Sequence, residues 1–190
     1  MTPSFALAFF TLAVLGPVAL WHFLLHGFLP AWRRNPAAFY VAGALVWVLF
    51  APLAWQLVDL SPQLFAPTPW ASAVGFAASG AGGLVFLWSL ATLTPRRFFA
   101  WAALRPESCE ARRVVRGPYR YVAHPSYLAL VAAVAGHFLA SGHAVLLGGA
   151  VGTGFLLSVV AALEQRELRE RLNRPLSERQ LAPPPLSSAT

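Results

Sequence analysis

Residues 126–163 read SYLALVAAVAGHFLASGHAVLLGGAVGTGFLLSVVAAL, and this stretch contains no Asp, Glu, Lys or Arg. A polar break at residues 141–143 divides it into two apolar segments. A helix needs about 20 mostly apolar residues to cross the hydrocarbon core of a bilayer. We therefore predict two membrane helices, a short one at 126–139 and a full-length one at 144–163, joined as a tight antiparallel hairpin.

Three further apolar stretches precede this hairpin, at residues 4–29, 37–58 and 70–93. The composition agrees with a membrane location, because 57% of the residues are hydrophobic and only 11% are charged. The mean hydropathy is +0.59, whereas an ordinary soluble domain carries about 25% charged residues. The sequence predicts an all-α polytopic membrane protein of about five transmembrane helices that ends in a helical hairpin.

The 14 basic residues, all arginines, occupy alternate connections between the apolar stretches. They lie in the connections 30–36 and 94–125 and after residue 163, while the two opposite connections and the N-terminus hold only Asp59 as a charged side chain. Cytoplasmic connections carry an excess of arginine and lysine. We therefore expect a multi-pass protein with its N-terminus outside and its C-terminus in the cytoplasm. This topology accounts for the net charge of +7, so we expect no nucleic-acid partner.

The chain is expected to form one membrane domain over residues 1–181, followed by a flexible tail at 182–190. Three consecutive prolines at 183–185 prevent the tail from forming a helix. The single cysteine, Cys109, excludes a disulfide framework and a cysteine-based zinc cluster. We expect no metal site, and the sequence does not determine the oligomeric state.

Small residues recur at four-residue spacing in the last three apolar stretches, and such faces let helix backbones approach closely in lipid. They are Gly75, Ser79 and Gly83, then Ala132, Gly136 and Ala140, then Gly148 and Gly152. We expect the two helices of the C-terminal hairpin to pack through these faces, with Gly152 at the contact.

A polar motif stands where the hairpin begins, and residues 116–127 read RGPYRYVAHPSY. Pro125 suits the first turn of a helix, where its missing N–H would have no partner. Free backbone N–H groups and the helix dipole make such a terminus an anion site, to which Arg116 and Arg120 add charge and His124 adds a donor. The alternative interpretation is an interfacial belt of aromatic and arginine side chains.

A second polar motif follows the hairpin, where residues 164–171 read EQRELRER. Glu167 has Arg171 four residues on, which is the favourable order for a helix ion pair. Glu164 has no such cation and sits in the last turn of an apolar span, where carboxylates are costly and often functional. Because the hairpin is antiparallel, we expect Glu164 to return to the depth of His124 and frame one pocket with it. The alternative is a charged juxtamembrane helix in water.

Together these motifs resemble the isoprenylcysteine carboxyl methyltransferase and phospholipid methyltransferase superfamily. Its members carry Gly-x-Tyr, then Arg-His-Pro-x-Tyr, a helical hairpin and Glu-Glu-x-x-Leu, and the resemblance covers about residues 93–176. Ala123 stands where the superfamily has arginine, and Gln165 where it has the second glutamate. Arg120 is the neighbouring cation that would replace the missing arginine.

The resemblance implies an S-adenosylmethionine site at the cytoplasmic face and a lipophilic or prenylated methyl acceptor that enters from the membrane lipid. Methyl transfer is an in-line displacement that needs mainly positioning and exclusion of water, so no dedicated catalytic base has to appear in the sequence. With the anion site included, the candidate cofactor-binding residues are Arg116, Gly117, Tyr119, Arg120, His124, Pro125, Tyr127 and Glu164.

Two other classes of protein share parts of this pattern. NADPH-dependent membrane reductases of similar architecture also carry a His-Pro-x-Tyr hairpin. A heme or metal protein is the non-enzymatic alternative, because His22 and His26 lie one turn apart. His137 and His143 fall near the opposite face of the membrane, so the four histidines cannot meet at one site. We interpret His22 and His26 as packing groups.

Overall fold

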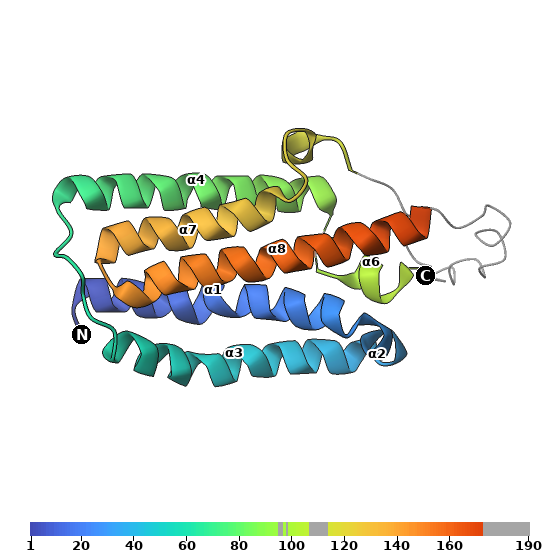
Figure 1. The fold of residues 1–190 in the computed structure, drawn as a ribbon, viewed down its shortest axis with the longest axis horizontal. Coiled ribbons are helices and arrows are strands. Elements are labelled where there is room, and N and C mark those ends of the chain that lie inside the picture. The colour runs from blue at the N-terminus through green and yellow to red at the C-terminus, as the bar shows by residue number, and fades with distance from the viewer. Residues whose placement is uncertain (95–96, 98, 107–113, 173–190) are drawn as a thin grey trace, which may run out of the picture.

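The computed structural model describes residues 1–94, 97, 99–106 and 114–172, and these residues form a bundle of helices (Figure 1). The expected all-α class is confirmed. Cys109 and the tail at 182–190 lie outside the described residues. The elements in chain order are α1 (Pro3–Gly27), α2 (Leu29–Arg34), α3 (Pro36–Asp59), α4 (Pro69–Leu93), α6 (Trp101–Leu104), the 3₁₀ turn η2 (Gly117–Arg120), α7 (Pro125–Ser141) and α8 (Ala144–Leu172).

The apolar helices α1, α3, α4, α7 and α8 run side by side along the bundle (Figure 1). Four of them, α1, α3, α4 and α8, are long and apolar enough to cross a membrane. The fifth, α7, has 17 residues, which is about 25 Å of helix and shorter than a typical span. α8 continues past its apolar part to Leu172, where the charged segment is supported by an ion pair between Arg166 and Glu170 at 2.9 Å.

The helices form a layered bundle in which α1, α7 and α8 lie between α3 and α4 (Figure 1). α3 packs on α1, and α4 packs on α7. A buried apolar cluster joins the middle helices and includes Leu12 of α1, Val134 of α7 and Leu146 of α8. α1 therefore lies directly against α8, which brings the N-terminal helix to the polar end of the C-terminal hairpin.

The closest approach of small residues lies between α4 and α7, and not within the hairpin as the sequence predicts. A Cβ built on Gly82 would lie 2.7 Å from the carbonyl oxygen of Ala129, and one on Gly136 would lie 3.0 Å from the backbone nitrogen of Ser79. By contrast, a Cβ on Gly148 or Gly152 meets nothing within 4 Å. The prediction of a Gly152 contact is wrong, because this face of α8 points away from α7.

The same holds for Gly83, whose added Cβ also meets nothing within 4 Å, whereas its neighbour Gly82 forms the contact. A four-residue spacing drifts slowly around a helix of 3.6 residues per turn, so it does not specify which of two adjacent small residues faces the partner.

Leucine in place of Gly136 is expected to destabilise the protein, because the side chain would collide with the backbone of α4. Overpacking at such a contact typically costs about 1 to 3 kcal/mol. The same change at Gly152 adds bulk to an open face and is expected to cost less than about 0.5 kcal/mol. Thermal melting of both variants in detergent measures the difference, and equal melting temperatures would contradict this packing.

A second apolar cluster fixes the arginine-bearing end of the bundle. Leu25 of α1, Leu29 of α2, Phe39 of α3 and Leu104 of α6 are buried there against one another. The guanidinium Nε of Arg33 donates to the carbonyl oxygen of Ala103 at 2.9 Å and so ties α2 to α6. These contacts set the end of α1 beside the polar end of α8, where the site lies.

Candidate functional site

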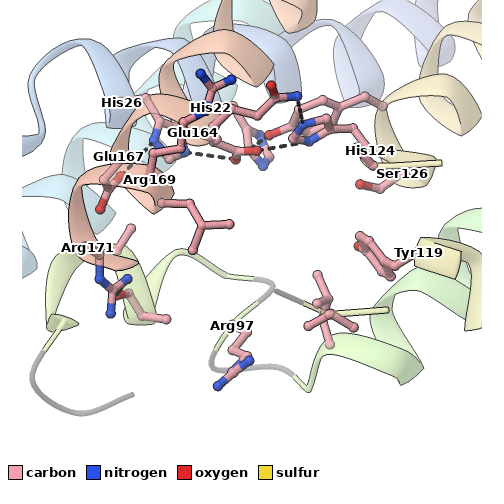
Figure 2. A pocket seen from close by; sticks show the side chains of 18 of the residues that line it. His22, His26, Arg97, Tyr119, His124, Ser126, Glu164, Glu167, Arg169 and Arg171 are labelled. Carbon is pink, nitrogen blue, oxygen red and sulfur yellow. Dashed lines mark hydrogen bonds and ion pairs between the residues drawn. The ribbon is translucent and has the colours of Figure 1, made fainter. Parts of the chain in front are cut away.

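A cavity of about 500 Å³ opens at the arginine-bearing end of the bundle. Its walls come from α1, α4, α6, η2, α7 and α8, so segments from both halves of the chain build it. Figure 2 shows its polar side chains converging on one space. Those labelled are His22, His26, Arg97, Tyr119, His124, Ser126, Glu164, Glu167, Arg169 and Arg171.

The carboxylate of Glu164 is the centre of this cluster. Its Oε1 accepts a hydrogen bond from the Tyr127 hydroxyl at 2.6 Å and lies 3.0 Å from Nε2 of His26. Its Oε2 lies 3.2 Å from Nδ1 of His124. The juxtaposition of His124 and Glu164 expected from the hairpin is therefore present. These three partners offset the free-energy cost of removing the half-buried carboxylate from water, as a charge inside an apolar bundle requires.

The imidazole of His124 is held in one orientation. Nδ1 faces the Glu164 carboxylate, and Nε2 lies 3.4 Å from the side-chain nitrogen of Gln165. Because a carboxylate only accepts and an amide NH₂ only donates, we assign the proton to Nδ1 and the lone pair to Nε2. Gln165 thus suits a His124 ring whose Nε2 carries the lone pair.

The rings around Glu164 form one wall of the cavity. His124 and Tyr127 stack with their centroids 5.1 Å apart and an angle of 8° between the planes. His22 meets Tyr127 edge to face at 5.5 Å, and its Nδ1 donates to the carbonyl oxygen of Val18 at 2.9 Å. Since Tyr127 is also held by Glu164, the wall is fixed before any ligand arrives.

Tyr119 projects into the cavity from η2, facing this wall (Figure 2). Burial raises the pKa of its hydroxyl above the ordinary value, although hydrogen bonds with Ser126 and Ser89 act in the opposite direction. The hydroxyl is therefore protonated at neutral pH and is available as a hydrogen-bond donor.

Glu167 does not pair with Arg171, so that prediction is wrong. Its Oε1 lies 2.6 Å from a guanidinium nitrogen of Arg33, and its Oε2 lies 3.6 Å from Nδ1 of His26. Residues three apart share a helix face, so Glu167 faces α1 and α2 together with Glu164. Arg171 instead donates to the backbone carbonyl oxygens of residues 102 and 106, at 3.4 and 3.2 Å.

His26 is the most buried of the site residues that sequence reasoning missed, which also include Arg97, Glu167, Arg169 and Arg171. Its side chain is only 6% exposed and lies between the carboxylates of Glu164 and Glu167. Its Nδ1 is buried and has no partner within hydrogen-bonding distance. The sequence does indicate His26, since His22 and His26 lie one turn apart at the depth of Glu164. It does not indicate that α1 packs against α8, and this packing brings His26 to the site.

The candidate residues of the 116–127 motif divide between two sides of the chain. Tyr119, His124 and Tyr127 line the cavity together with Glu164, whereas Arg116, Gly117, Arg120 and Pro125 do not. Arg116 points to the end of α4, where its guanidinium lies 3.4 Å from the carbonyl oxygen of Thr92. A cofactor-binding role for these four residues stays a prediction.

Among the described residues, the arginines that line the cavity are Arg97, Arg169 and Arg171, so Arg120 does not replace the arginine for which Ala123 stands. The reason is the 3₁₀ turn, which directs Tyr119 inward and leaves Arg120 exposed. Gly117 makes this turn possible, because its φ of +57° is a left-handed conformation and its α-carbon packs on the Thr92 side chain.

Comparison with known proteins identifies the family of the chain. The model of the phospholipid methyltransferase family matches residues 70–173, which is more than half of the chain. The protein thus belongs to the phospholipid methyltransferase family, a family of membrane methyltransferases, and the resemblance inferred from the motifs is confirmed. No curated protein and no solved structure gives a match.

The matched segment supplies α4, η2, α7 and α8 and with them Tyr119, His124, Tyr127 and Glu164. His26 and Arg33 lie outside it, on α1 and α2. Within the described part of the chain, no group of three or more histidine, cysteine, aspartate or glutamate side chains is arranged to hold a metal ion.

Proposed function

We propose that this chain transfers a methyl group from S-adenosylmethionine to a lipophilic acceptor at the arginine-bearing face of the membrane. The observation that carries the proposal is the cavity at the end of an apolar bundle, in which Glu164 holds His26, His124 and Tyr127 in one cluster. The family supports methyl transfer, while the donor and the acceptor are inferences from the chemistry of the cavity.

The lining residues fit the donor. The cavity of about 500 Å³ lies within the range of about 300 to 1,000 Å³ for small-molecule sites. S-adenosylmethionine combines a carboxylate, an ammonium group, ribose hydroxyls and an adenine ring. Arg169 and Arg171 suit the carboxylate, Glu167 suits the ammonium or a hydroxyl, and the stacked His124 and Tyr127 offer a flat surface to the ring. When bound, the donor supplies a methyl group on a positively charged sulfur.

The protein's own part in the reaction is to position and to exclude water. Glu164 fixes the rings of His124 and Tyr127 from behind, so no rearrangement of this wall is needed on binding. The apolar residues Val18, Phe86 and Leu130 line the same cavity and keep water from the transferred group. Such an arrangement suits an in-line displacement, for which a correctly held pair of reactants is the main requirement.

The acceptor is a lipophile, such as a prenylated molecule or a membrane lipid. The cavity lies within a bundle whose four long helices have the hydropathy of membrane spans, so an acceptor dissolved in lipid reaches it without crossing bulk water. The oligomeric state in which this occurs is left open.

The decisive experiment is calorimetric titration of the detergent-solubilised protein with S-adenosylmethionine and, separately, with NADPH. We expect saturable binding of S-adenosylmethionine and no binding of NADPH. Binding of NADPH alone would contradict the proposal and favour a membrane reductase of similar architecture. A Soret band in the purified protein would favour a heme protein instead.

We further propose that the N-terminus lies outside and that the cavity opens to the cytoplasm. α2, α6 and the end of α8, which adjoin the arginines, lie at the end of the bundle opposite the N-terminus (Figure 1). A cysteine introduced at Asp59 should therefore react with a membrane-impermeant thiol reagent in intact cells, while one at Arg34 should be shielded. Reaction at position 34 from outside would contradict this orientation.

A further inference from the structure

A second hollow lies on the opposite side of the 118–132 segment from the cavity. It measures about 490 Å³ and is a groove between α4 and α7 whose walls are almost entirely apolar. The residues of the segment divide between the two spaces. Tyr119, His124 and Tyr127 face the cavity, whereas Tyr121 and Pro125 face the groove. η2 and the start of α7 therefore separate the two, and the groove is distinct from the proposed methyl-transfer site.

Small side chains make the groove. Along its floor α4 and α7 meet at Gly82 and Ala129, and alanines at 78, 81 and 132 leave the space beside this contact unfilled. From Trp88 to Ala78 the groove follows about 15 Å of α4. The length and apolar walls suit one hydrocarbon chain that lies along the helices, as lipid chains do in a bilayer.

One end of the groove has the features of a lipid headgroup site. Trp88 and Tyr121 stand there, 49% and 74% exposed, and such aromatic side chains are typical of the membrane–water interface. Arg116 and Arg120 flank η2 at the same end, and Arg116 reaches the carbonyl oxygen of Thr92 one turn beyond Trp88.

Neither arginine is neutralised by the ion pairs of the described residues. Those pairs join Glu164, Glu167 and Glu170 to His26, Arg33, His124 and Arg166. Pro118 and Tyr121 line the groove, and these two cations are their neighbours in the chain at η2. The groove is therefore complementary to an acidic lipid, because a phosphate accepts charge-assisted hydrogen bonds from guanidinium groups. A zwitterionic lipid fills the same groove but brings no net negative charge to the arginines.

We propose that this groove binds one chain of an acidic phospholipid, with the headgroup phosphate held by Arg116 and Arg120. The site gives a role to Arg116, Arg120 and Pro125, which do not line the cavity. It binds a lipid of defined charge next to the methyl-transfer site without presenting that lipid for reaction. The inference does not depend on S-adenosylmethionine as the donor.

Native mass spectrometry of the detergent-solubilised protein tests this proposal, with phosphatidylglycerol and phosphatidylcholine of identical chains as the probes. We expect phosphatidylglycerol to bind more tightly. Arg116→Gln and Arg120→Gln should each weaken binding of phosphatidylglycerol about fivefold, which is the contribution typical of one basic residue near an acidic membrane surface. The double variant, which loses two such contributions, should weaken it about thirtyfold. Both changes should weaken binding of phosphatidylcholine less, because its choline group offsets the charge of the same phosphate.

Ala132→Phe fills the groove and should weaken binding of both lipids. Ala78→Phe fills the groove from the α4 side. It is used in place of Ala132→Phe if the Ala132→Phe variant has a lowered melting temperature. The matched controls are Ala44→Phe on the exposed face of α3 and Arg166→Gln on the surface of α8, where the arginine side chain is 78% exposed. Both controls should bind lipid as the unmodified protein does.

Three results would overturn the proposal. The first is equal binding of the two lipids by the unmodified protein, which would show that no headgroup is selected. The second is unchanged phosphatidylglycerol binding in well-folded Ala132→Phe and Ala78→Phe. The third is an equal loss of phosphatidylglycerol affinity in Arg166→Gln and Arg116→Gln, which would show that the effect depends only on the net charge of the protein. Calorimetry with S-adenosylmethionine on the same samples reports on methyl-donor binding independently.

Discussion

Glutamine in place of Glu164 is expected to weaken S-adenosylmethionine binding roughly 10- to 150-fold. The carboxylate orients His124 through Oε2 and Tyr127 and His26 through Oε1. An amide retains one acceptor oxygen and sets an NH₂ group against a donor, so at least one of these partners is released. Losing a hydrogen bond to a charged group typically costs about 1.5 to 3 kcal/mol. Calorimetric titration in detergent measures the effect directly.

The matched control is glutamine at Glu170, which pairs with Arg166 on the surface of α8 and is 61% exposed. Exposed pairs of this kind contribute only about 0.3 to 0.5 kcal/mol, so the affinity should change by less than a factor of about three. Glu167 is not a suitable control, because it contacts Arg33 and His26 at the site. Unchanged affinity in a well-folded Glu164→Gln sample would contradict the placement of the donor in this cavity.

Alanine in place of His26 is expected to lower both the stability of the protein and its affinity for the methyl donor. The side chain separates the carboxylates of Glu164 and Glu167 and is almost fully buried. Without it, the two like charges face each other across a void. Breaking a fully buried charged pair costs about 3 to 5 kcal/mol. Since these carboxylates are 28% and 18% exposed, we expect about 2 to 3 kcal/mol in thermal denaturation and about a tenfold loss of affinity.

Alanine at His137 provides the comparison for His26. Its Nδ1 lies 2.8 Å from the Thr11 hydroxyl, in a contact between α1 and α7 away from the cavity lining. Interhelical hydrogen bonds in membranes contribute about 0.6 kcal/mol on average and at most about 1.7 kcal/mol. The His137 variant should therefore melt slightly lower but bind S-adenosylmethionine normally. Equal losses of affinity in the two variants would show that His26 acts only through general stability.

The sequence by itself determined the properties that depend on the local order of residues. Apolar length predicts where each long helix runs, and the break at residues 141–143 predicts the hairpin. An antiparallel hairpin brings its two polar ends to one depth, so the meeting of His124 with Glu164 followed from two helix lengths and a turn. The family resemblance rests on the same local motifs, and the match of the family model over residues 70–173 confirms it.

Only the tertiary structure decided which helix faces which. The pairing of Glu167 with Arg33, and the position of His26 between two carboxylates, depend on α1 lying against α8, and residues more than 130 positions apart carry no periodicity that reports this. The same reason applies to the small residues. Their spacing indicates a face suited to close packing, but a helix in lipid is apolar all round, so nothing in its pattern distinguishes the face that meets α7 from the face that meets lipid.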